Sequence, residues 1–321
     1  MLVHESAKIK NPKGYENPQL LITADDLGAL LGLSMRRFKS SKRGHVQKSR
    51  KHRLSAENLE LGSERLLIGD KRTLVLDLRP ADVFAAGHIQ TAVHIDLFGV
   101  SLIDTDPAPL EAFLWMIVHM FEGRGVSEDC RVVVYDDRSG MRAARAFWFL
   151  EFFGHTDVQM LDGGFTAWKS AGWPVTIDAM VPISHVWKIR RTDERLATWC
   201  HVRDRIGHEG VVVVDTRSEG EYLGETVRAR RAGAIPGAIH VEWTRNLDPA
   251  GAFKTAHELK DMYEKVGVAP GCEVITYCQG GYRAAHSYLA LRLLGYPSVR
   301  NYIGSWKEWA NREELPIKNS L

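Results

Sequence analysis

The sequence predicts an α/β protein built from two similar domains, each a small parallel sheet with helices on both faces. Three observations support this: short runs of Val, Ile and Leu alternate with helical segments, the chain repeats itself at long range, and its 321 residues suffice for two cores. Apolar strands separated by helices are typical of a parallel sheet covered on both faces. Ligands of such a sheet bind beyond the carboxyl ends of its strands.

The repeat relates a stretch beginning near residue 130 to one beginning near residue 272. The residues of the first stretch that match are Cys130, Tyr135, Arg142, Gly154 and Trp168; their counterparts in the second are Cys272, Tyr277, Arg283, Gly295 and Trp309. Earlier in each copy, residues 76–79 (LDLR) correspond to residues 214–217 (VDTR). We therefore predict one domain over residues 18–178, a linker over 179–192 and a second domain over 193–318.

Each copy contains two evident strands. Thr73–Leu76 and Arg131–Tyr135 are the expected strands of the first copy, and Val211–Val214 and Glu273–Tyr277 those of the second. The longest apolar run, Phe113–Val118, is too short to cross a bilayer and predicts a buried helix.

Three of the four cysteines are expected to be inert. Cys130 and Cys272 each stand just before a Val- and Ile-rich run and should lie at strand starts, whereas Cys200 lies in a predicted helix beside Trp199. The scattered cysteines form no disulfide framework and no Cys-x-x-Cys metal spacing, so a reducing compartment fits best.

The fourth cysteine, Cys278, is the candidate nucleophile. In the sequence VITYCQGGYRAAH, residues 274–286, a β-branched run ends at Cys278, a glycine turn follows and a helix begins. This order places the sulfur in a loop whose N–H groups can turn inward, at a helix N-terminus that favours an anion. We expect a thiol there to ionise readily and act as a nucleophile. The alternative is a buried small hydrophobe beside an ordinary turn.

The first copy lacks this cysteine. With Arg142 and Arg283 aligned, Asp137 stands where the second copy has Cys278, and one extra residue, Asp136 or Asp137, precedes the loop. A carboxylate there would repel an anionic substrate and cannot act as a sulfur nucleophile. We therefore expect one active copy and one structural copy.

Composition excludes several other classes of protein. With 45% hydrophobic and 26% charged residues and a net charge of +2, the chain is typical of a soluble globular protein without a nucleic-acid or membrane partner. The N-terminus lacks the pattern of a secretory signal, so we expect a cytoplasmic protein. Residues 36–53, inside an insertion of about 36–72, are strongly basic. We favour the interpretation that this segment is a solvated insertion. The alternative is that it docks a polyanion or a partner protein.

Several motifs resemble those of a known family. Asp215–Arg217, Glu221–Gly224 and Ile235–Ala238 resemble the first half of an active rhodanese domain, and Asn301–Trp309 resembles the closing signature of its tandem members. Leu161–Trp168 is the corresponding degenerate element of the first copy. The chain is thus similar to tandem-domain rhodaneses, which are thiosulfate or 3-mercaptopyruvate sulfurtransferases, over nearly everything except the N-terminus and the basic insertion. Such proteins also have an inactive first domain and tend to be monomers.

The resemblance implies a mechanism without metal or organic cofactor. The Cys278 thiolate would take the outer sulfur of a small-molecule donor, expel sulfite or pyruvate, and pass the sulfur from a persulfide to cyanide, a thiol or a protein acceptor. Arg283 would supply positive charge for the donor; its alternative is a structural pairing with Asp215 or a neighbouring carboxylate. The residues expected to bind substrate or line the loop are Gln279, Gly280, Gly281, Tyr282, Arg217 and Asp215.

Loop length and charge separate the remaining alternatives. Four residues lie between Cys278 and Arg283, whereas related cysteine phosphatases have five, so the tighter loop favours a single sulfur atom over a phosphate. The loop resembles that of bacterial tandem members, but Glu221 stands where both named types usually carry an arginine. We favour thiosulfate as the donor because nearby arginines add positive charge; the alternatives are 3-mercaptopyruvate as donor, or a persulfide carrier serving a protein acceptor.

Overall fold

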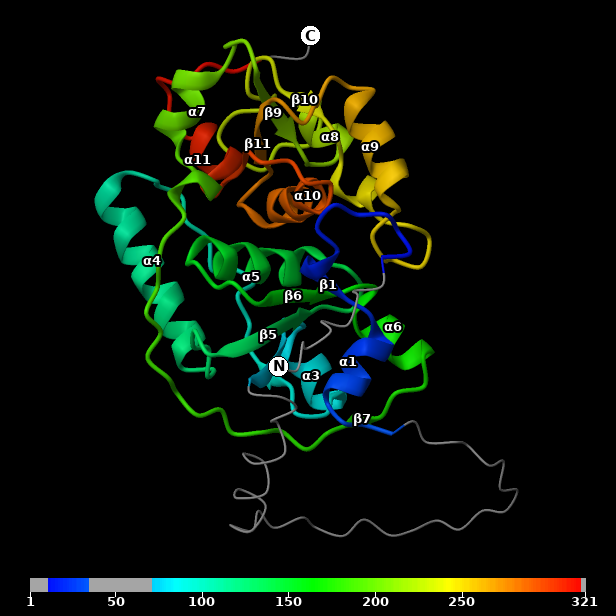
Figure 1. The fold of residues 1–321 in the computed structure, drawn as a ribbon. Helices are drawn as coiled ribbons and strands as arrows, with labels where there is room; N and C mark the ends of the chain where they lie inside the picture. The colour runs from blue at the N-terminus through cyan, green and yellow to red at the C-terminus, as the bar shows by residue number, and fades with distance from the viewer. Residues whose placement is uncertain (1–10, 35–70, 319–321) are drawn as a thin grey trace, which may run out of the picture.

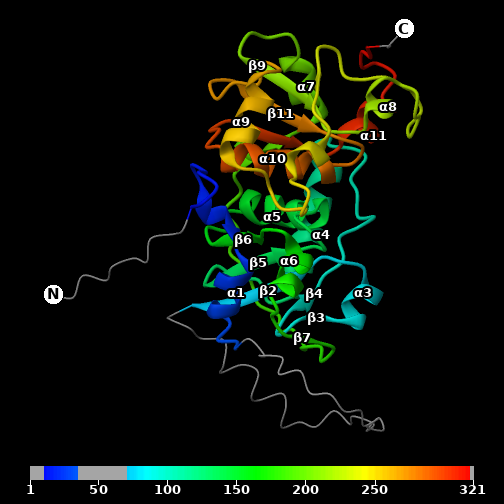
Figure 2. The ribbon, with the colours of Figure 1, turned by 90° about the vertical axis from the view of Figure 1, so that its right-hand side faces the viewer.

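The computed structural model describes residues 11–34 and 71–318. The basic segment 36–53 lies outside the described residues. In the described part, two α/β domains are stacked on one another, with helices of both domains between the two sheets (Figures 1 and 2). No helix of this part is long and apolar enough to span a membrane.

The first domain contains a five-stranded parallel sheet in the order β1-β6-β5-β2-β4. Its strands are β1 (Leu21–Ile22), β2 (Arg72–Asp77), β4 (Val93–His94), β5 (Cys130–Tyr135) and β6 (Val158–Leu161). A short antiparallel pair joins β3 (His88–Ile89) to β7 (Val175–Thr176). The helices are η1 (Pro18–Leu20), α1 (Ala24–Leu30), α3 (Ala81–Ala86), α4 (Pro107–Glu122), α5 (Met141–Phe152) and α6 (Gly164–Ser170).

The second domain repeats this plan with the order β10-β9-β11-β12-β8, again all parallel. Its strands are β8 (Leu196–Ala197), β9 (Val211–Asp215), β10 (Ile239–His240), β11 (Glu273–Tyr277) and β12 (Val299–Tyr302). Its helices are η2 (Asp193–Arg195), α7 (Trp199–Arg205), α8 (Glu219–Tyr222), η3 (Trp243–Asn246), α9 (Ala256–Glu264), α10 (Tyr282–Leu293) and α11 (Ser305–Trp309). The predicted fold class is confirmed.

The four expected strands are present, and β11 has the predicted bounds; β2, β5 and β9 are one or two residues longer than expected. Two details of the cysteines are also confirmed, since Cys130 begins β5 and Cys200 lies in α7. The apolar run in α4 is amphipathic rather than fully buried. Phe113 and Ile117 enter the core while Trp115 is 65% exposed, because only one face of α4 packs on the protein.

Equivalent helices of the two copies, α5 and α10, pack against each other at the centre of the molecule (Figure 1). Their apolar residues belong to one continuous core that extends into both domains. Glu151 of α5 fixes the pair by accepting hydrogen bonds from Tyr288 and Arg292 of α10. The residues before η1 also reach across, since the Glu16 N–H donates to the Leu293 carbonyl at 3.1 Å.

A buried ion pair lies at the carboxyl end of β9 in the second domain. Arg217 Nη2 lies 2.6 Å from Asp215 Oδ2, and the same guanidinium donates to the Gly233 carbonyl at 2.8 Å. The Tyr277 hydroxyl donates to Asp215 Oδ2 at 2.5 Å, so the carboxylate ties β9 to β11. The first domain has the same network, made by Asp77, Arg79, Gly87 and Tyr135. We refer to each network as an Asp–Arg clamp.

We expect Arg79→Met to lower the free energy of unfolding by about 3 kcal/mol, because it leaves the Asp77 carboxylate buried without a counter-charge. Urea unfolding followed by tryptophan fluorescence measures the loss. The double variant Asp77→Asn/Arg79→Met removes both charges and should regain most of it. Equal losses in the single and double variants would contradict the electrostatic explanation.

Candidate active site

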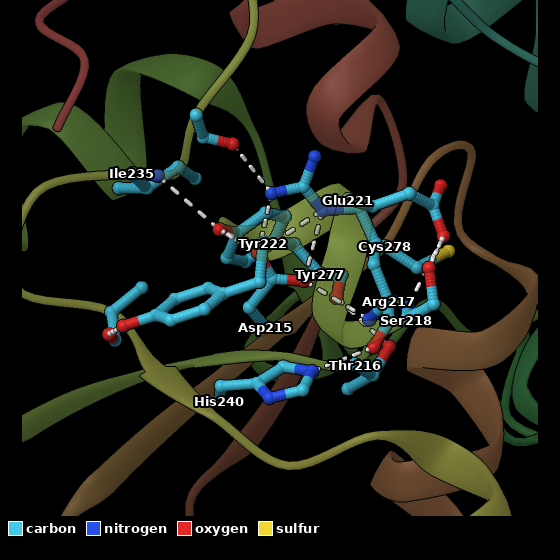
Figure 3. A network of polar contacts seen from close by, with 12 residues as sticks. Asp215, Thr216, Arg217, Ser218, Glu221, Tyr222, Ile235, His240, Tyr277 and Cys278 are labelled. Atoms are coloured by element: carbon cyan, nitrogen blue, oxygen red, sulfur yellow. Dashed lines mark hydrogen bonds and ion pairs between the residues drawn. The ribbon is translucent and has the colours of Figure 1, made fainter. Parts of the chain in front are cut away.

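Cys278 is the first residue after β11, and α10 begins four residues later at Tyr282. The predicted strand–loop–helix arrangement is therefore present, and the sulfur lies at the carboxyl edge of the parallel sheet, where α/β proteins bind ligands. The Cys278 side chain is only 1% exposed. Figure 3 shows it on the side of the Asp–Arg clamp where Ser218 and Glu221 lie.

One backbone group of the loop is directed at the sulfur. The Gly281 N–H donates to Cys278 Sγ at 3.1 Å, and Gly281 adopts a left-handed conformation (φ +82°) just before α10. An N–H group at a helix N-terminus stabilises negative charge on the atom that it faces. The other loop residues serve different purposes: Gln279 Nε2 donates to the Arg228 carbonyl at 2.9 Å, and the Tyr282 hydroxyl donates to the Leu97 carbonyl at 2.6 Å.

Ser305, which the sequence analysis assigned no role, closes the loop. Its hydroxyl accepts hydrogen bonds from the N–H groups of Cys278 and Gly281, each at 3.1 Å, and donates to the Tyr302 carbonyl at 2.7 Å. Ser305 is held at φ +54°, a left-handed conformation that a side chain disfavours. The equivalent residue of the first domain is Gly164 at φ +58°. The sequence signal that could have pointed to Ser305 is the serine that replaces a glycine when the two repeats are aligned.

Arg283 does not offer a free charge. Its Nη1 lies 2.5 Å from Glu221 Oε2 and its Nη2 lies 3.0 Å from Oε1, so the guanidinium and carboxylate form a two-pronged pair. Burial would raise the pKa of Glu221, but the hydrogen bonds and charge of Arg283 outweigh it and lower this pKa to about 2. Burial likewise opposes the charge of Arg283, yet Glu221 and the attraction of Cys278 raise its pKa. The alternative given above, pairing with a neighbouring carboxylate, is what the structure shows.

Asp215 and Arg217 do not reach the sulfur. Each side chain is at most 1% exposed, and its polar groups are engaged within the clamp (Figure 3). Arg217 Cζ also lies 4.4 Å from the centroid of the Trp306 ring. The expectation that these two residues bind substrate stays a prediction, and these contacts give them a structural role. They position the carboxyl ends of β9 and β11, from which the Cys278 loop departs.

The strand register corrects the alignment of the first copy. Asp77 pairs with Tyr135 as Asp215 pairs with Tyr277, so Asp136, not Asp137, occupies the position of Cys278. The extra residue lies inside the loop, which has five residues (136–140) where the second domain has four (278–281). The alignment of Arg142 with Arg283 assigned Asp137 to the position of Cys278 because it placed the extra residue before the loop.

The Asp136 carboxylate fills the N–H cradle of its own loop. Its oxygens accept from the N–H groups of Asp137 at 2.8 Å and Arg142 at 3.2 Å, and burial raises its pKa to about 6. The loop position that holds a sulfur in the second domain thus holds a carboxylate in the first, and different N–H groups bind it. In the first domain the loop N–H groups are therefore occupied by a side chain of the loop itself.

The first domain covers the Cys278 loop from the other side. The Leu97 carbonyl accepts a hydrogen bond from the Tyr282 hydroxyl, and Ser101 lies beside Gly280. Further along, Thr105 donates through its hydroxyl to the Glu308 carboxylate of α11 at 2.9 Å. Residues 97–105 therefore form one wall of the site. Within the described residues, no group of three or more His, Cys, Asp or Glu is placed to hold a metal ion.

Comparison with known proteins gives a consistent result. The family model described as Rhodanese-like domain matches residues 64–171 and 200–312. The chain is 35% identical to the thiosulfate sulfurtransferase of Pseudomonas aeruginosa over 251 residues, which are 76% of this chain and 90% of that protein. It is 36% identical to the sulfur carrier protein TtuD of Thermus thermophilus over 214 residues, 62% of this chain and 74% of that protein.

A solved structure shares the fold. The anaerobic ergothioneine biosynthesis enzyme from Chlorobium limicola, in complex with trimethyl histidine, aligns with a TM-score of 0.74 over 96% of this chain and 71% of that chain. The identity is 21%, so this likeness concerns the fold alone.

Two variants of Ser305 test its part in closing the loop. Ser305→Ala should lower the free energy of unfolding by about 2 kcal/mol, because two buried N–H groups lose their acceptor. Ser305→Gly loses the same acceptor but relieves the left-handed strain, so it should be more stable than the alanine variant by about 1 kcal/mol. Thermal unfolding of the three proteins measures both differences; an alanine variant as stable as wild type would refute the role.

Glu221 should give the stability a defined pH dependence. Its folded pKa of about 2 lies below the ordinary 4.5, so the unfolded chain binds the proton first as the pH falls. The Glu221→Gln variant has no titratable group at this position. The difference in free energy of unfolding between wild type and this variant should therefore decrease by about 1 kcal/mol when the pH is lowered from about 6 to about 4. Urea unfolding at both pH values measures it, and a difference that stays constant would contradict the pairing with Arg283.

Proposed function

The chain belongs to the rhodanese-like domain family, and from that premise we propose that it is a sulfurtransferase that moves a sulfane sulfur from thiosulfate to a thiophilic acceptor through a Cys278 persulfide. The observation that carries the proposal is the Cys278 loop. The Cys278 sulfur lies at a helix N-terminus, receives an N–H hydrogen bond, and stands in a four-residue turn. The named activity of the Pseudomonas relative supports the same chemistry.

The proposed reaction has two steps. The Cys278 thiolate attacks the outer sulfur of thiosulfate; an S–S bond forms to Cys278 as the S–S bond of thiosulfate breaks, and sulfite leaves with the electron pair. Cyanide or a thiolate then attacks the outer sulfur of the persulfide, and the Cys278 thiolate is released. The sulfur bound to the enzyme is an anion in both resting forms, so N–H groups directed at it stabilise both.

Donor choice depends on the charge near Cys278. Thiosulfate is a dianion, and the Glu221 carboxylate neutralises Arg283, which is the arginine of the loop itself. The remaining attraction comes from the helix N-terminus and from arginines on the α8–β10 connection such as Arg228, whose Nε lies 3.6 Å from Glu221. We favour thiosulfate because of the named relatives, and 3-mercaptopyruvate, a monoanion, is the alternative donor.

A persulfide carrier is the second candidate function. The similarity to a protein named as a sulfur carrier favours it, as does the 1% exposure of Cys278, which suits delivery to a docked acceptor protein more than rapid exchange with free solutes. A carrier would form the persulfide but discharge it slowly to cyanide. In either case we propose a monomer acting in the reducing cytoplasm, where its four cysteines stay free.

The first test is sulfur transfer to cyanide by wild type and Cys278→Ala, with thiosulfate and 3-mercaptopyruvate in parallel. Intact mass after donor treatment is recorded on the same samples. We expect thiocyanate production and a mass gain of one sulfur in wild type, and neither in the variant. Persulfide formation without turnover would favour the carrier, and no sulfur gain from either donor would refute the proposed enzyme.

Glu221→Gln should change the preference between donors. The variant leaves the Arg283 charge uncompensated, so the KM for the dianion thiosulfate should fall several-fold more than that for 3-mercaptopyruvate. Arg283→Gln is the matched control, since it removes the charge and should raise the KM for thiosulfate. Parallel changes for both donors in Glu221→Gln would show that this pair does not govern donor choice.

A further inference from the structure

Arg145 is a buried arginine of the first domain that has no counter-ion. It lies on α5, on the side packed against the second domain, and its side chain is fully buried. Nη1 donates to the Leu97 carbonyl at 3.2 Å, but within the described residues Nε and Nη2 have no hydrogen-bond partner, and no carboxylate pairs with the guanidinium. A buried charge without a partner is expensive to maintain, so its retention calls for an explanation.

The guanidinium packs against the residue that follows the Cys278 loop. Arg145 Cζ lies 3.9 Å from the centroid of the Tyr282 ring. Tyr282 is the first residue of α10 and directly follows Gly281, whose N–H meets the sulfur. The Leu97 carbonyl accepts from both Arg145 and the Tyr282 hydroxyl, so the two side chains are fixed on one acceptor.

The other arginines around Cys278 are already neutralised. Arg283 is paired with Glu221, and Arg217 is paired with Asp215. Burial lowers the pKa of Arg145 to about 10, while the charges of Tyr282 and Cys278 oppose this shift, so the guanidinium stays protonated at neutral pH. Of these three arginines, only Arg145 has its charge uncompensated when Cys278 is a neutral thiol.

The repeat supplies an internal comparison. With α5 aligned on α10, Arg145 corresponds to His286, and the two side chains lie at equivalent places facing the opposite domain's loop. His286 Nε2 donates to the Ser139 carbonyl of the Asp136 loop at 2.8 Å, and burial lowers its pKa to about 3, so it is neutral. A cation therefore faces the loop that carries the sulfur, and a neutral ring faces the loop that carries its own carboxylate.

We propose that Arg145 is the counter-ion of the sulfur anion on Cys278, supplied by the domain that lacks a nucleophile. This inference rests on the proposed function, and it assigns the first domain a part in the chemistry. Arg145 is a positioning residue: it acts by its charge and through Tyr282. Because Cys278 bears one negative charge as thiolate and one as persulfide, the same cation stabilises both forms, with no proton or electron transferred to Arg145.

The test is the pH dependence of Cys278 alkylation by iodoacetamide, quantified by peptide mass mapping so that the other cysteines do not interfere. In Arg145→Met the midpoint of the profile should move to higher pH by about one unit, and persulfide formation from thiosulfate at neutral pH should fall about tenfold. Arg145→Lys keeps the charge and should retain most of the wild-type profile. Arg131→Met, which removes a partly buried arginine paired with Asp157 elsewhere in the same domain, should leave the profile unchanged.

Stability provides the second readout. If Arg145 serves the sulfur anion, removing an uncompensated buried charge should not lower the melting temperature, and Leu97 keeps its bond from Tyr282 in the variant. Arg145→Gln, which stays polar, is the second neutral variant should the methionine variant fold poorly. A folded Met or Gln variant with the wild-type alkylation profile would overturn the inference. Alkylation needs no sulfur donor, so this result is independent of whether wild type forms a persulfide, which tests the proposed function.

Discussion

The hydroxyl of Ser305 determines the shape of the loop on which the site depends. By accepting from the N–H groups of Cys278 and Gly281, it closes a four-residue turn whose first residue is the nucleophile and whose last leads into α10. The strained backbone of Ser305 is the cost of placing that oxygen there. In the first domain a glycine occupies the equivalent position, the loop is one residue longer, and an aspartate fills the N–H cradle. Two copies of one fold thus differ in function through a few residues at one edge of the sheet.

Most positive charges around Cys278 are paired with a carboxylate. The clamp arginine Arg217 is compensated by Asp215, and the loop arginine Arg283 by Glu221. The groups that act on the sulfur are then the helix N-terminus, the Gly281 N–H, Arg283 in its pair with Glu221 and, on our proposal, the buried Arg145 of α5. A site of this kind presents little net charge to solvent, which accords with a Cys278 side chain that is almost fully covered.

The fold and the strand–loop–helix setting of Cys278 were predictable because both follow from local patterns. Apolar runs separated by helices gave the strands, and a β-branched run before Cys-Gln-Gly-Gly gave the loop. The pairing of Arg283 with Glu221 joins residues 62 positions apart, and the sequence left open whether a carboxylate held that arginine. Assigning Asp137 to the nucleophile position failed because a one-residue insertion can be located only from strand register. Arg145 was missed because the sequence of a largely apolar helix does not indicate which residues of the other domain an arginine in it contacts.

The packing of α5 on α10 brings equivalent surfaces of the two repeats together, as in a homodimer with a twofold axis. In a true homodimer every substitution appears twice, so a cation facing one loop would face the other as well. Covalent fusion removes that constraint. On the proposed function, only the second half carries a nucleophile, and the two halves present different residues to each other, as the pair Arg145 and His286 illustrates. The tandem chain then corresponds to an asymmetric dimer, in which the first half is a permanently attached subunit of the proposed active site in the second.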